Sequence, residues 1–213
     1  MKHGFSFLAL LAFAIAASAQ PITSNSLYRV TPEFPKYVTA HVEFRDPAGV
    51  RWPSFFYGKP AANGSVRLDR TQPAATLKLN CNERPQKNGD QSRRVLGELF
   101  NDPKRKDGVA IQIDGIGSIK TSAETNGSMS ATLVGTIDVA GKRIPVNAPA
   151  TLRLHTGVKG DEKNDALMIE FQFEAKAGEL GLKTFEASSP INIRASVTAY
   201  SDAAVAAAAA KKR

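Results

Sequence analysis

Residues 129–155 read MSATLVGTIDVA, then GKR, then IPVNAPATLRLH, and this stretch decides the fold. Apolar and polar residues alternate on both sides of the central Gly141-Lys142-Arg143. Successive side chains of a strand point to opposite faces, so period two over this length predicts two half-buried strands. Gly141 supplies the turn, and the product is an antiparallel hairpin with one apolar and one polar face. The apolar series is Met129, Ala131, Leu133, Ile137 and Val139, then Val146, Ala148, Ala150, Leu152 and Leu154.

The same alternation recurs along the chain at short spacing. Further strands are expected near residues 27–30, 37–44, 66–69, 75–80, 109–113, 167–175 and 191–200. Asp46–Gly49 and Asn63-Gly64 are interpreted as turns, and residues 50–57 as an irregular aromatic segment. Gly115 and Gly117 predict a bend or bulge.

One segment changes period and predicts a helix. Val95, Leu96, Leu99 and Phe100 fall on one helical face, and Asp102-Pro103 ends it. A long antiparallel sheet with one apolar face removes its edges by closing. We therefore predict an all-β fold, a closed antiparallel barrel of about eight strands with one or two short helices.

The chain ends differ in composition from the middle. Lys2 and His3 precede an apolar run over residues 5–17, and Ala17-Ser18-Ala19 follows, as in a secretory signal peptide. We predict a signal peptide over residues 1–19, a barrel domain over 20–201, and an Ala-rich disordered or frayed tail over 202–213. The apolar run is short for a membrane span of about 20 residues, so no stable membrane insertion is expected. Periplasmic or secreted localisation follows.

The charge argues against a nucleic-acid partner. The net charge is +8, and Lys2 and the final Lys-Lys-Arg supply four of those charges. The remaining bias is mild, spread out and without interleaved aromatic residues, so nucleic-acid binding is not expected. Oligomeric state stays open, a homodimer included.

No residue pattern predicts an enzyme. His41 and His155 are isolated in their strands, so no metal site is expected, and no G-x-S-x-G motif is present. Cys81 is the one candidate nucleophile, because Arg84 would favour its thiolate. It also shares parity with the apolar Leu77 and Leu79, which favours a buried inert thiol. A Cys81-dependent redox protein is the less favoured alternative, and no cofactor is predicted.

Three stretches resemble the YceI-like, polyisoprenoid-binding proteins of bacterial periplasms. Residues 92–103 resemble the family's R-D-x-H-L-x-x-x-x-F-F-D helix and its exit. Residues 135–146 resemble its G-x-L-T-L-x-G-V-T-K-P-V hairpin, and residues 171–182 resemble F-x-I-D-R-x-D-F-G-I. The resemblance implies a lipocalin-like barrel of eight antiparallel strands with a long apolar pocket for an isoprenoid chain, and no catalytic residues.

Two interpretations of the barrel interior remain open. Many inward positions are alanine, which favours a hollow that a long apolar lipid fills, since an eight-stranded barrel is just wide enough for one ligand. Alternatively the predicted helix face fills the space, and the protein is a structural or partner-binding barrel. The aromatic residues 52–57 either rim the barrel mouth or close one end. The predicted apolar lining is Phe44, Leu79, Leu96, Leu99, Phe100, Ile111, Ile113, Leu133, Ile137, Ala148, Ala150, Leu152, Ile169, Phe171 and Phe173.

The signal-peptide assignment is directly testable. Cleavage after Ala19 should give a mature protein that begins at Gln20. N-terminal sequencing of the exported protein measures this, and retention of residues 5–17 would contradict it.

Overall fold

The computed structural model describes residues 26–30, 40–56, 62–69, 71–81, 98–99, 109–121, 128–139, 141–155 and 166–210. The predicted signal peptide, most of the predicted helix and the final Lys-Lys-Arg lie outside these ranges. The described elements are β1 (Ser26–Val30), β2 (Ala40–Arg45), β3 (Arg51–Phe56), β4 (Ala62–Leu68), β5 (Ala74–Cys81), β6 (Val109–Ile116), β7 (Lys120–Thr121), β8 (Ser128–Val139), β9 (Lys142–His155), β10 (Ala166–Lys176), β11 (Pro190–Ser201) and α2 (Asp202–Ala210).

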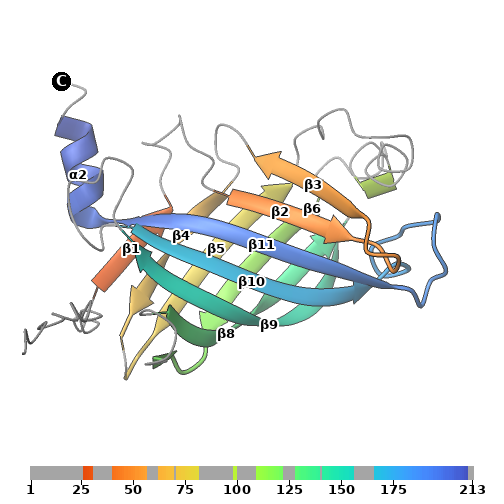
Figure 1. Cartoon of the computed structure of the whole chain (residues 1–213), viewed down its shortest axis with the longest axis horizontal. Helices are drawn as coiled ribbons and strands as arrows, with labels where there is room; N and C mark the ends of the chain where they lie inside the picture. The colour runs from red at the N-terminus through yellow and green to blue at the C-terminus, as the bar shows by residue number, and fades with distance from the viewer. Residues whose placement is uncertain are drawn as a thin grey trace, which may run out of the picture.

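Eight of the strands close into an antiparallel barrel (Figure 1). Their order is β1-β4-β5-β6-β8-β9-β10-β11, and β1 closes the ring because it pairs with both β4 and β11. The predicted lipocalin-like barrel of about eight strands is therefore confirmed.

Strand β11 pairs with two different strands along the same edge. Its C-terminal end pairs with β1 through Tyr200 and Ser201, and its N-terminal half, from Asn192 to Val197, pairs with β2. β3 pairs with β2 in continuous register, so the β2–β3 hairpin extends the sheet beside the barrel (Figure 1). The prediction of an irregular segment over residues 50–57 is wrong for 51–56, which form a regular strand.

The central hairpin forms as predicted. β8 and β9 pair without interruption from Ser128 opposite Arg153 to Val139 opposite Lys142. Gly141 takes a positive φ of 81° in the turn, which glycine adopts at little cost, and its N–H donates to the Asp138 carboxylate at 2.9 Å. Buried and exposed residues alternate along β8 as the sequence pattern requires.

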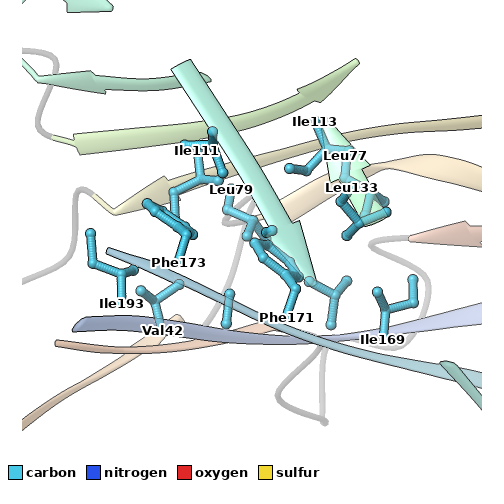
Figure 2. Packing of buried hydrophobic residues seen from close by; sticks show 14 of the residues in the cluster. Val42, Leu77, Leu79, Ile111, Ile113, Leu133, Ile169, Phe171, Phe173 and Ile193 are labelled. Carbon is cyan, nitrogen blue, oxygen red and sulfur yellow. The ribbon is translucent and has the colours of Figure 1, made fainter. Parts of the chain in front are cut away.

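The inward faces form one apolar core (Figure 2). Two acidic residues are also buried in the described part of the chain, and both have partners within the β2–β3 hairpin. Asp46 accepts the Val50 N–H at 2.8 Å in the β2–β3 turn, and Glu43 pairs with Arg45 on the outer face of β2. Charges are therefore kept out of the interior, where they would be costly to desolvate.

Two glycine-containing segments depart from regular strands in different ways. The predicted bulge is confirmed, because the register between β6 and β8 shifts between Ile113 and Gly115. The predicted turn at Asn63-Gly64 is wrong, since both residues lie inside β4. Gly64 is needed there because a Cβ would lie 1.9 Å from the Thr76 carbonyl oxygen of β5. Glycine here permits close approach of two backbones and does not end the strand.

The Ala-rich segment continues from β11 as helix α2 (Figure 1). Its described side chains are exposed or half-buried. The Ser201 hydroxyl accepts the Ala204 N–H at 3.2 Å, and Asp202 pairs with Arg29 at 2.7 Å with both side chains more than half exposed. Such exposed pairs contribute little, so the domain boundary near Ser201 stays a prediction. Within the described residues, no helix combines the length and apolarity that a bilayer span requires.

A substitution at Gly135 tests how closely the backbones of β8 and β6 approach each other. A Cβ at Gly135 would lie 1.9 Å from the Gln112 carbonyl oxygen and 2.8 Å from the Ile113 Cα of β6. Gly135→Ala should lower the free energy of unfolding by about 3 kcal/mol, because backbone must move to accept the methyl group. Urea denaturation measures this. Gly117→Ala is the control, since its nearest contact would be 3.6 Å, and an equal loss in both variants would contradict the explanation.

Candidate functional site

The barrel interior is the candidate site, and the structure brings the predicted lining together there. Every predicted lining residue within the described ranges is buried, and these residues belong to one apolar cluster. Leu96 and Phe100 lie outside the described residues. Contact of this lining with a ligand stays a prediction.

Alanines lie beside an aromatic residue on the barrel wall. Ala150 of β9 lies between Ala131 of β8 and Phe171 of β10, and Phe171 lies opposite Ala195 of β11. The rings of Phe171 and Phe173 stack with centroids 6.5 Å apart and an interplanar angle of 12°. Residues directly opposite each other on paired strands contact one another, so Ala150 and Ala195 make room for the Phe171 ring between them.

The middle of the interior is closely packed. Leu79, Ile111 and Leu133 are 0% exposed, so water reaches none of their surface. An open hollow would leave the residues that line it accessible. Figure 2 shows Phe171 and Phe173 pointing toward Leu79 and Ile111 on the opposite wall. In this conformation the interior is filled along these residues, and a ligand there would have to displace side chains.

The interior offers apolar contacts and almost no polar chemistry. Among the described inward positions, the Tyr28 hydroxyl is the one polar side-chain group, and the remainder are hydrocarbon side chains, the Met129 thioether and two glycines. Apart from the Tyr28 hydroxyl, these described positions hold no side chain that acts as a general acid, general base or nucleophile. A long hydrocarbon suits such a surface, because burial of apolar area is non-directional and needs no matching polar groups.

One end of the barrel is covered by the β10–β11 connection and a helical turn at Glu98 and Leu99. Leu99 is 0% exposed and joins the core, as do Leu180 and Leu182 of the connection. The Glu98 carboxylate accepts the Lys183 N–H at 2.7 Å, the Thr184 N–H at 3.2 Å and the Thr184 hydroxyl at 2.8 Å. The predicted lining does not include Leu180 and Leu182, because it is drawn from strand parity and from the predicted helix, and these leucines lie in the connection between two strands.

The residues weighed for other chemistry do not gather into a site. His41 lies on β2, where burial lowers its pKa, the Glu43 carboxylate opposes this and Arg194 adds to it. In the described part of the chain, no group of three or more His, Cys, Asp or Glu residues could hold a metal ion. Cys81 ends β5 opposite Val109, and its side chain lies outside the described atoms, as do those of His155 and of residues 52–56.

Solved structures share this fold at low sequence identity. BcnA of Burkholderia cenocepacia superimposes with a TM-score of 0.50 at 13% identity, over 75% of this chain and 95% of that one. A polyisoprenoid-binding domain from Saccharophagus degradans, implicated in plant cell wall breakdown, gives 0.50 at 10% identity, over 84% and 99%. A mutant CJ YCEI protein gives 0.45 at 12% identity, over 66% and 81%. No family model matches the sequence, and neither does any curated protein. The YceI-like fold implied by the sequence resemblance is confirmed as a fold.

The Glu98 contacts predict how the covered end is held. Glu98→Ala should expose the Lys183 and Thr184 amides, because each loses its charge-assisted acceptor, and should lower stability by about 1–3 kcal/mol. Hydrogen exchange of these two amides measures the effect directly. Glu186→Ala, an exposed acidic residue of the same connection, is the control. Unchanged protection at Lys183 would contradict the contact.

Proposed function

We propose that this protein holds a long apolar lipid of isoprenoid type inside its β-barrel, in the periplasm or outside the cell. The observation that carries the proposal is the inner face, where the described strands present a continuous apolar surface without a charged side chain. The protein acts as a binding protein in this proposal, and no catalytic residue is assigned.

Chain length decides whether a lipid can enter a packed interior. Each buried CH₂ contributes about 0.8 kcal/mol, so a chain of twenty carbons gains roughly 16 kcal/mol before costs. Loss of translational and rotational freedom costs about 4–15 kcal/mol, and forcing extra volume into a packed core costs about 1–3 kcal/mol. A chain of twenty carbons therefore exceeds these costs over most of their combined range of about 5–18 kcal/mol, whereas a chain of eight carbons, at roughly 6 kcal/mol, exceeds only the lower end.

Two further findings support this proposal. The barrel shares its fold with the polyisoprenoid-binding domain from Saccharophagus degradans. The stretches over residues 92–103, 135–146 and 171–182 resemble motifs of the same kind of protein. Secretion rests on the residues 1–19, which read as a signal peptide.

A filled structural or partner-binding barrel is the second candidate, because the middle of the interior has no surface that water reaches. Native mass spectrometry of protein purified from its own host, before and after solvent extraction, separates the two. The lipid proposal expects a mass excess that extraction removes. Protein that carries no lipid from its host, and takes up none when offered an isoprenoid alcohol, would overturn it.

Ala150→Phe separates the candidates by whether lipid binding is lost. If a lipid enters beside Ala150, the added ring should weaken binding of a long-chain isoprenoid alcohol and, because the lipid-free interior is packed, should also lower the melting temperature. If the core is already filled, the ring costs about 1–3 kcal/mol of stability and there is no binding to lose. Calorimetry and lipid titration measure both. Arg153→Phe, an exposed position on the same strand, is the control.

A further inference from the structure

The wall of the barrel is incomplete between β9 and β10. These strands pair from Ala166 opposite His155 to Phe171 opposite Ala150, and within the described residues the pairing goes no further. Both strands nevertheless continue, β9 back to Lys142 and β10 on to Lys176. On its other side β10 pairs with β11 over its full length. We call residues 142–149 and 172–176 the β9–β10 seam.

Two prolines explain why the pairing stops. Residues of an antiparallel strand direct their N–H groups alternately to one neighbour and to the other. Lys142 flanks a two-residue turn and bonds to Val139 of β8, so odd-numbered residues of β9 face β10. The next pair after Ala150–Phe171 would need an N–H from position 149, which is Pro149. Pro145 removes a second donor on the same side.

Side chains close the interior along this seam. Val146 and Ala148 of β9 are 3% and 0% exposed, and Ala175 of β10 is 3% exposed. Phe173 is 8% exposed, whereas its partner Ile193 on the paired side of β10 is 0% exposed. The wall here is therefore held by side-chain packing and not by paired backbone.

We propose that the β9–β10 seam is the lateral entrance through which an apolar chain passes into the barrel. This inference rests on the proposed lipid-binding function and adds the route. Separating the two strands beyond Gln172 breaks no ladder hydrogen bond, whereas separating most other strands of the ring would break several. The β1–β11 junction, which pairs at two positions, is the other short contact. The two prolines also make this edge a poor template for an added strand, so it stays available to a ligand.

A cross-link across the seam tests the route. In a Cys81→Ser background, Asn147→Cys and Glu174→Cys place thiols on the exposed outer face of the two strands. A flexible bismaleimide then ties the strands together. Protein loaded with a fluorescent long-chain isoprenoid alcohol is mixed with phosphatidylcholine vesicles, and the rate of transfer is followed. We expect transfer to slow by roughly tenfold or more, as when a gating segment is held shut.

The matched control places the same cross-link on the intact side of β10. Gln172→Cys and Arg194→Cys are exposed partners on the paired strands β10 and β11, and this cross-link should leave the transfer rate unchanged. Equal transfer rates in the two cross-linked proteins would overturn the proposal that the seam is the entrance, and would leave the lipid-binding proposal unaffected. Protein that never loads lipid would overturn both proposals.

A second variant tests the cause without any lipid. Pro145→Thr with Pro149→Thr restores two N–H donors facing β10 and should lengthen the β9–β10 ladder. In the parent protein, the Glu174 amide should exchange faster than that of Phe173, which faces β11, and faster than that of Gln172, which faces the Pro149 carbonyl at the end of the ladder. The double variant should slow exchange at Glu174 and slow lipid transfer as well. Uniform protection along β10 in the parent protein would contradict an unpaired seam.

Discussion

Closure of the sheet through β1 is the interaction on which the rest of the structure depends. This strand pairs with β4 from Ser26 to Val30 and with the last two residues of β11. Without it, β4 and the end of β11 would be open edges, and the apolar inner faces would meet water. One short strand thus converts an alternating sheet into a closed core. Because β11 gives the rest of its edge to β2, closure is concentrated at one end of the barrel.

Alternation in the sequence was sufficient to predict the eight strands of the barrel and their inward faces, because period two is a local property of the chain. Two predictions failed where local composition resembled a turn or a loop. Asn63-Gly64 lies inside β4, and Gly64 is required there because the backbone of the paired strand β5 approaches it closely. Local composition does not show which backbone will lie beside a glycine. Residues 51–56 contain Pro53 and lack alternation, yet β2 holds them in register.

The sequence predicted which residues lie inside the barrel, but it did not predict whether the interior is empty or filled. Parity identified the buried positions, since a residue's face follows from its strand. Parity does not give the register between strands, and register decides that Ala150 sits beside Phe171. The inward alanines therefore indicated an empty space that the structure fills with the aromatic rings of β10. Volume depends on which large residue neighbours which small one, and composition alone does not contain that information.

A tightly packed barrel can still bind a ligand if two neighbouring strands of its wall can separate. Packed side chains such as Phe171 and Phe173 can move only if the backbone beside them is free to separate, because neighbouring strands in a complete ladder are held by every second residue. Pro145 and Pro149 remove that constraint on one side of β9, while β8 holds the other side along its full length. Strand β9 is thus firmly paired with β8 on one side and only partly paired with β10 on the other. A fully bonded barrel with the same apolar interior would keep its side chains packed and offer a lipid no route into the core.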